Sequence, residues 1–145
     1  MDDLDRDILN LLSKDGRLSH EQIGREIQLS RPAVFERIKR LEARKVIKGY
    51  TARIDWEATG LPLTAFILIR LQAANCNETG REIAKLAVEG ALMESLHRVT
   101  GDWCMLAQYR VAAPSVLQEM IDRIRLVPGV QNTNTMLALS SFEHP

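Results

Sequence analysis

The sequence has few of the features that mark a secreted, membrane-spanning or metal-binding chain. Only two of its 145 residues are cysteine, Cys76 and Cys104, and no group of cysteines and histidines has the spacing of a metal site. No apolar run approaches the roughly 18 residues that cross a bilayer, and the acidic start MDDLDRD is unlike the basic, then apolar, start of a signal peptide. These absences predict a cytoplasmic protein with free thiols, no metal, no cofactor and no membrane partner.

An excess of charge of one sign is also absent, because 19 basic residues balance 19 acidic ones. The distribution of charge is uneven. Residues 1–30 carry a net charge of −3, whereas residues 31–53 hold eight basic and two acidic side chains, a net charge of +6. A local positive patch of this kind is typical of a surface that binds phosphates.

The composition is that of a folded globular chain. Apolar residues make up 46% of the sequence and charged residues 26%, which excludes a disordered or collagen-like protein. The length allows one ordinary domain or two small ones.

The first third of the chain predicts three helices. Apolar residues recur there at helical spacing, and each helix has start or stop signals. The first predicted helix carries Leu4, Ile8, Leu11 and Leu12, has Asp2 and Asp3 at its start and ends at Asp15-Gly16. The second covers about residues 20–27 after the capping box of Ser19 and Gln22, and the third runs from the cap Ser30 to about Arg44.

The rest of the chain predicts strands that alternate with helices. A short strand or extended linker is expected at 46–54, and Gly60-Leu61-Pro62 separates a domain of about 1–60 from one of about 61–145. The predicted elements of the second domain are strands at 63–72, 92–99, 103–111 and 130–139, with helices at 78–89 and from Pro114 onwards. The order β-α-β-β-α-β is that of a ferredoxin-like sandwich, so the fold class is α+β.

Such a sandwich leaves one face of its sheet without helices. Tyr109 or Arg110, together with Ile67, Ile69 or their neighbours on the opposite pleat, would lie on this face. A bare face with this apolar content normally needs a partner, so we expect a homodimer through the second domain.

The second and third predicted helices and the turn between them form a helix-turn-helix. If Val34, Ile38 and Leu41 face inward, the basic side chains of the third helix reach phosphates and guanine edges of double-stranded DNA. The alternative is a three-helix cap with a solvated basic face. The predicted DNA-binding residues are Ser30, Arg31, Ala33, Arg37 and Arg40 near the bases, and Lys39, Arg44, Lys45 and Lys48 on the phosphate backbone.

These residues also carry a family resemblance. The runs LDRDILNLLSKDGRLSHEQIG and LSRPAVFERIKRLEARKVIKGYTARID resemble the DNA-binding half of the Lrp/AsnC transcription regulators. The later segments VTGDW and PGVQNTNT resemble the effector and oligomerisation domain of that family, called the RAM domain. The resemblance implies a sequence-specific regulator that is dimeric, often octameric, and responsive to a small molecule, usually an amino acid bound between dimers.

The resemblance also implies where an effector would bind. The pocket would be built around the turn that joins two strands, with the last strand nearby, and backbone N–H groups at a glycine turn suit a carboxylate. The implied effector-binding residues are Thr100, Gly101, Asp102, Trp103 and Cys104 in the turn, and Thr133 and Thr135 in the last strand.

Three positions depart from the family pattern. Cys104 stands where an acidic residue is usual, and an unperturbed thiol is no fixed anion for a ligand ammonium near neutral pH. Gln28 and Lys45 stand where glycine is common, and a non-glycine residue with a positive φ costs about 1 kcal/mol, which a packed turn tolerates.

The sequence is also compatible with two other functions. One is an architectural protein of the same fold that wraps DNA without an effector. The other is a small-molecule-binding regulatory subunit of an enzyme, although catalysis by this chain is not expected because no nucleophile or acid–base pair with a partner is recognisable.

Overall fold

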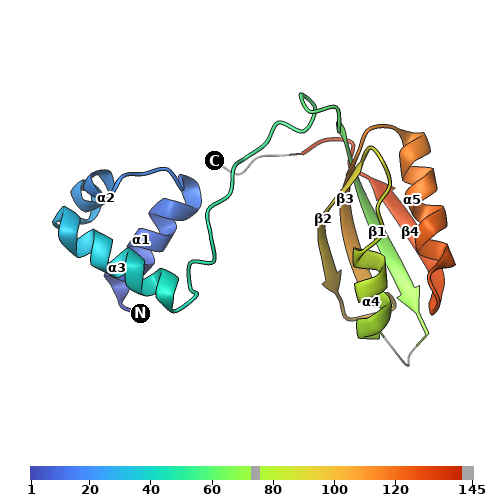
Figure 1. Ribbon diagram of the computed structural model, residues 1–145, viewed down its shortest axis with the longest axis horizontal. Helices are drawn as coiled ribbons and strands as arrows, with labels where there is room; N and C mark the ends of the chain where they lie inside the picture. Colours follow the sequence, from blue (N-terminus) through green and yellow to red (C-terminus); the bar gives the residue numbers. More distant parts are fainter. Residues whose placement is uncertain (73–75, 142–145) are drawn as a thin grey trace. The chain divides into compact units, whose positions relative to one another are not determined.

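A computed structural model describes residues 1–72 and 76–141 of the chain (Figure 1). The chain divides into two compact units, Met1–Arg53 and Ile54–Pro145, each of which has its own apolar core. The boundary expected near residue 60 remains a prediction.

The N-terminal unit holds the three expected helices, α1 (Asp3–Lys14), α2 (His20–Ile27) and α3 (Arg31–Ala43). The predicted capping box of α2 is present, since the Ser19 Oγ accepts from the Gln22 amide and the Gln22 side chain accepts from the Ser19 amide. A second capping box begins α1, where Asp2 and Asp5 accept from each other's amides. The apolar sides of the helices meet in a core of Ile8, Ile23, Val34, Ile38 and Leu41.

The turn between α2 and α3 is tight. Gln28 has the left-handed backbone that its position suggested, with φ 56°, and the Leu29 amide donates to the Gly24 carbonyl at 2.9 Å. Gly24 is buried, and a Cβ at this position would overlap the carbonyl oxygen of Leu29. Lys45, just after α3, is also left-handed, with φ 58°.

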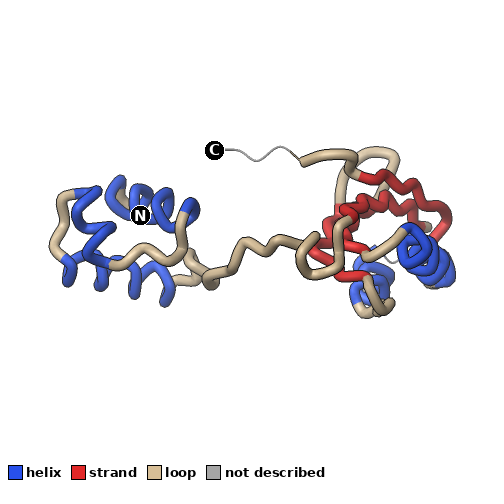
Figure 2. The backbone as a smooth tube through the Cα atoms, turned by 90° about the horizontal axis from the view of Figure 1, so that it is seen from above, coloured by secondary structure: helices blue, strands red, loops and turns tan. Residues whose placement is uncertain are grey.

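The C-terminal unit is the expected ferredoxin-like sandwich. Its elements are β1 (Leu63–Leu71), α4 (Cys76–Ala84), β2 (Ala91–Arg98), β3 (Met105–Val111), α5 (Pro114–Leu126) and β4 (Val130–Leu137). The strands form one antiparallel sheet in the order β2-β3-β1-β4. Figure 2 shows α4 and α5 on one side of the strands.

The two-residue period of the strands decides which side chains the helices cover. Ile67, Ile69 and Tyr109 are fully buried on the covered face. Their neighbours Phe66 and Arg110 point to the other face. Of the candidates for the bare face, Arg110 is therefore correct, whereas Tyr109, Ile67 and Ile69 belong to the core.

One predicted helix differs clearly in its bounds. The helix expected at 78–89 begins at Cys76 and ends at Ala84. After Ala84 the backbone hydrogen bonds join residues three apart, and the chain continues as a loop in which Val88 is buried in the core. Of the two alternatives for the segment 46–54, a short strand or a linker, the structure shows a linker, since this segment contains no strand.

Candidate nucleic-acid interface and effector site

Five of the nine predicted DNA-binding residues lie on α3, and the other four are its cap Ser30 and the three cations that follow the helix. The opposite side of this helix is anchored in the core through Val34, Ile38 and Leu41, which are at most 5% exposed. The cations that are exposed between the start of α3 and Lys48 are Arg31, Lys39, Arg40, Arg44, Lys45 and Lys48.

The first turn of α3 is fixed by its cap. The Ser30 Oγ accepts from the Ala33 amide at 3.4 Å, and its own O–H remains a donor. Pro32 occupies the first turn, where the missing N–H costs no helix hydrogen bond. Ser30 is exposed and Ala33 is half-buried, so a ligand can approach this end of the helix closely.

Arg37, unlike the cations named above, is largely buried and paired with acidic residues. Its side chain is only 20% exposed, and its Nη1 donates to both carboxylate oxygens of Asp2, at 2.8 and 2.9 Å, and to Asp5 at 2.7 Å. The Arg40 Nη2 lies 3.7 Å from the same Asp5 carboxylate. The structure thus uses Arg37 to tie α3 to the start of α1, a contact that the helical spacing did not reveal.

These contacts shift the pKa values of the acidic partners. The hydrogen bond from Arg37 holds the pKa of Asp2 below its ordinary value. Burial works to raise the pKa of Asp5, but the hydrogen bonds from Arg37 and from the Asp2 amide outweigh it, and the net pKa of Asp5 is lowered. Asp5 is therefore an anion that the fold stabilises although its side chain is buried.

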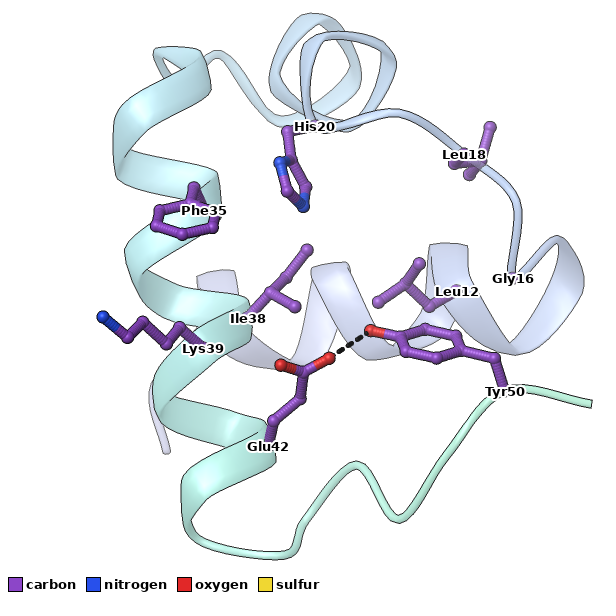
Figure 3. Close-up of a pocket in the computed structure, with 9 residues that line it drawn as sticks. All are labelled: Leu12, Gly16, Leu18, His20, Phe35, Ile38, Lys39, Glu42 and Tyr50. Carbon is purple, nitrogen blue, oxygen red and sulfur yellow. Dashed lines mark hydrogen bonds between the residues drawn. The ribbon is translucent and has the colours of Figure 1, made fainter.

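A groove of about 540 Å³ lies between α1, α2, α3 and the segment after α3 (Figure 3). Phe35 and His20 meet edge to face at a ring distance of 5.5 Å. Across the groove, the Tyr50 hydroxyl donates to Glu42 at 2.9 Å, and burial together with this bond raises the pKa of Tyr50. The sequence analysis did not single out this groove. The signal for it was the exposed Phe35, an aromatic residue outside the apolar stripe of α3.

The predicted effector turn, Thr100 to Cys104, is pinned to the end of β1. The Cys104 amide donates to the Ile69 carbonyl at 2.9 Å, and the Leu71 amide donates to the Cys104 Sγ at 3.3 Å. Gly101 has a φ of 102°, and nothing lies within 4 Å of the place where its Cβ would be. Thr100, Gly101 and Asp102 are exposed, so the turn is open to a ligand.

Arg70 is a contributor to this turn that the sequence analysis missed. Its Nε donates to the Asp102 carbonyl at 3.1 Å, and its guanidinium carbon lies 4.9 Å from the centre of the Trp103 ring. The single charge in the apolar run of β1 was the available signal. The arrangement places a cation beside the candidate turn.

The two predicted threonines lie on the other side of β1. Thr133 pairs with Ile69 and Thr135 with Ile67, so both are on the helix-covered face. Thr133 is 9% exposed, and its Oγ1 accepts from the Arg125 Nε at 2.9 Å. The structure therefore brings Thr133 to the same end of the sheet as the turn, with β1 between them.

The open face of the sheet carries a polar cluster among apolar residues. Glu94 accepts from the Arg110 Nε at 2.8 Å and from the Gln108 side-chain Nε2 at 2.7 Å, and the Arg110 Nη1 donates to the Thr64 hydroxyl. Trp56 lies 5.9 Å from the Arg110 guanidinium. The half-buried Phe66, Leu68 and Leu106 share this face.

Within residues 1–72 and 76–141, no group of three or more His, Cys, Asp or Glu side chains could hold a metal ion. No helix in that part of the chain has the length and apolarity needed to span a membrane.

Comparison with known proteins gives matches to both units. Residues 1–42 match the AsnC-type helix-turn-helix domain family, and residues 64–144 match the Lrp/AsnC ligand-binding domain family. The transcriptional regulator FL11 of Pyrococcus horikoshii is 32% identical over 143 residues, which cover 99% of this chain and 92% of that protein.

Solved structures agree with these matches. LrpC of Bacillus subtilis superposes with a TM-score of 0.84 at 28% identity and covers 100% of this chain and 99% of its own. The feast or famine regulatory protein of Mycobacterium tuberculosis, solved in complex with L-methionine, gives a TM-score of 0.83 at 33% identity, covering 99% of this chain and 95% of its own. FL11 and the LrpA protein of M. tuberculosis are transcriptional regulators, which argues against catalysis by this chain.

Proposed function

Since this chain belongs to the Lrp/AsnC family of transcriptional regulators, we propose that it binds double-stranded DNA through α3 and responds to an amino acid bound by its C-terminal unit. The observation that carries the DNA-binding proposal is the orientation of α3. One side of this helix is anchored in the core, while Arg31, Lys39 and Arg40 are exposed. A helix held in this way can enter a major groove without losing its own packing.

Each predicted DNA-binding residue has a role in this proposal. Ser30, Arg31 and Ala33, in the first turn, lie where a recognition helix meets base edges, and Arg40 lies two turns further on the exposed side. Lys39, Arg44, Lys45 and Lys48 bind phosphates. Arg37 acts mainly by holding α3 against α1 through Asp2 and Asp5.

Binding to a DNA fragment, measured by fluorescence anisotropy, tests these roles. Replacing Arg31 or Arg40 by Gln is expected to weaken binding by about tenfold if the residue contacts a base. A matched control is Lys85→Gln in the C-terminal unit, which removes the same charge outside α3 and should leave binding unchanged. Equal affinities for all of these variants and the parent chain would contradict the proposal.

We further propose that two copies pair through the open face of the sheet. Apolar side chains there surround an ion pair, Glu94 with Arg110, which is only about one-fifth exposed. A dimer would present two α3 helices to successive major grooves of a pseudo-palindromic site. Light scattering at low micromolar concentration tests this, and a monomeric mass would contradict it. A mass four times that of the dimer would extend the proposal to an octamer.

The effector proposal rests on the exposed turn from Thr100 to Cys104. Its glycine backbone offers N–H groups to a carboxylate, and Arg70 adds a positive charge beside it. The relative from M. tuberculosis was solved with L-methionine, which supports an amino acid as the ligand class.

A specific observation favours a second function, an architectural DNA-wrapping protein without an effector. Position 104 carries a cysteine and no carboxylate, its Sγ already accepts from the Leu71 amide, and the Thr133 hydroxyl already accepts from Arg125. Calorimetry with the twenty amino acids separates the two functions. Heat from any of them supports the effector-responsive regulator, and no heat from all of them supports the architectural protein. Either function is consistent with the cytoplasmic location expected from the sequence.

A further inference from the structure

Glu36 is an acidic residue on the exposed side of α3. Residues four apart share one face of a helix, so Pro32, Glu36 and Arg40 form a row along α3. All three are exposed, and the row lies opposite the buried side of Val34 and Ile38. An acidic side chain therefore stands in the middle of the surface that the proposed function assigns to DNA.

The Glu36 carboxylate has no ion-pair or hydrogen-bond partner within residues 1–72 and 76–141. Glutamate four residues before arginine can form an ion pair on a helix, and the described part of the chain has such pairs at Glu21 with Arg25 in α2 and at Glu119 with Arg123 in α5, the latter at 2.7 Å. Glu36 and Arg40 have the same spacing and order, but the Arg40 guanidinium lies toward Asp5, at 3.7 Å. The acceptor capacity of Glu36 is thus left for a ligand.

A carboxylate that faces DNA is repelled by the phosphates, so its presence weakens binding to DNA of arbitrary sequence. The repulsion is offset only where a donor on a base edge meets the carboxylate. In the major groove the amino groups at N4 of cytosine and N6 of adenine are donors, whereas the O6 and N7 of guanine and the O4 of thymine are acceptors. Adenine also presents its N7 acceptor beside the amino group, which repels a carboxylate, so cytosine is the base that suits glutamate.

We infer that Glu36 selects cytosine at one position of each half-site by accepting a hydrogen bond from the N4 amino group. The network of Asp2, Asp5 and Arg37 supports this role, because Asp5 draws Arg40 away from Glu36. This inference rests on the proposed DNA binding and adds a residue that chooses among sequences.

Enrichment of a random-sequence DNA library by the full chain tests the inference, followed by affinity measurements on the enriched site and on copies with one base pair replaced. The parent chain should enrich cytosine at one position per half-site and lose about tenfold in affinity when that base pair is changed. Glu36→Gln should lose the preference for cytosine at this position and bind random DNA more tightly than the parent chain. Glu89→Gln, which removes an exposed carboxylate in the C-terminal unit, should do neither.

The outcomes distinguish this inference from the proposed function. If the parent chain enriches a site and Glu36→Gln enriches the same site with the same discrimination, the inference is wrong while DNA binding stands. If the position that changes is not cytosine, the inference is also wrong. If no DNA is bound even at low salt, the proposed function itself fails.

Discussion

The two units of this chain are stabilised in different ways. The C-terminal unit buries fourteen residues of the described chain in one apolar cluster between a sheet and two helices. The N-terminal unit buries only five, and it adds two capping boxes and the contacts of Asp2 and Asp5 with Arg37. A small helical unit that presents charge on its surface has little apolar area to bury, so polar contacts take a larger share of its stability. The same polar contacts orient the helix proposed to bind DNA.

The largest effect is expected in the C-terminal core. Ile67→Ala removes a side chain that is 0% exposed in the central strand β1, which should lower the free energy of unfolding of this unit by about 4 kcal/mol. Leu126→Ala, at a side chain that is 82% exposed, is the control and should change stability by less than about 0.5 kcal/mol. Calorimetry of the full chain measures both. An equal shift of the N-terminal transition would contradict the description of two separate cores.

The next effect is expected at the turn before α3. Gly24→Ala places a Cβ against the Leu29 carbonyl, and the backbone shift that follows should cost about 3 kcal/mol in the N-terminal unit. Gly16→Ala is the matched control, because its Cβ would meet Tyr50 at an ordinary distance of 3.6 Å. Urea unfolding followed by circular dichroism compares the two. Similar losses of stability for both variants would show that the close approach at Gly24 is unimportant.

A smaller loss is expected from the ionic contact between α1 and α3. Asp5→Asn should lower the free energy of unfolding by about 2 kcal/mol, because a buried carboxylate that accepts from Arg37 is lost. Asp3→Asn, which breaks only an exposed pair with Arg6, should cost less than about 1 kcal/mol.

Acid should reveal the same contact. The folded pKa of Asp5 lies below the ordinary value of 3.8, so the unfolded chain takes up this proton first as the pH falls. The stabilisation by Asp5 is present above that value and is lost as the pH drops through the folded pKa. Thermal unfolding between neutral pH and pH 2 should therefore show a shallower acid loss for Asp5→Asn than for the parent chain. Identical acid profiles would argue against the assignment.

The smallest effect is expected at Tyr109, and it has the opposite sign. No hydrogen-bond partner for its buried hydroxyl is found in the described part of the chain, so Tyr109→Phe should raise stability by up to about 1 kcal/mol. Burial raises the pKa of this tyrosine from 10.0 to about 12. The unfolded chain therefore ionises first, and stability is lost as the pH rises from 10 through 12. Tyr109→Phe should not show this loss of stability at alkaline pH. A variant that is less stable than the parent chain at neutral pH would contradict the account.

Local signals predicted most of the fold. The capping box of Ser19 and Gln22 and the cap Ser30 marked the starts of α2 and α3, and the alternation of strands and helices predicted the sandwich. These features are fixed by neighbours within a few residues, which a single sequence contains.

The features that were missed depend on contacts between distant residues. Asp2, the partner of Arg37, lies 35 residues away in sequence. Helical spacing predicted on which side of the helix Arg37 lies, but it could not predict this partner. α4 ends early because Val88, which follows it, packs into the core of the C-terminal unit. Which side chains of β1 and β3 the helices cover depends on the face of the sheet on which α4 and α5 pack. Arg70 joined the candidate effector turn through a register between strands that only the fold supplies.

The salt dependence of DNA binding tests the central claim, that the exposed cations on and after α3 hold DNA, most directly. The logarithm of the binding constant of the full chain should fall linearly with the logarithm of the salt concentration, with a slope of about −0.9 for each phosphate neutralised. A variant with Lys45→Gln and Lys48→Gln should have a slope that is shallower by about 2, since each lysine is assigned one phosphate. An unchanged slope for this variant, or no binding by the parent chain in dilute buffer, would contradict the account.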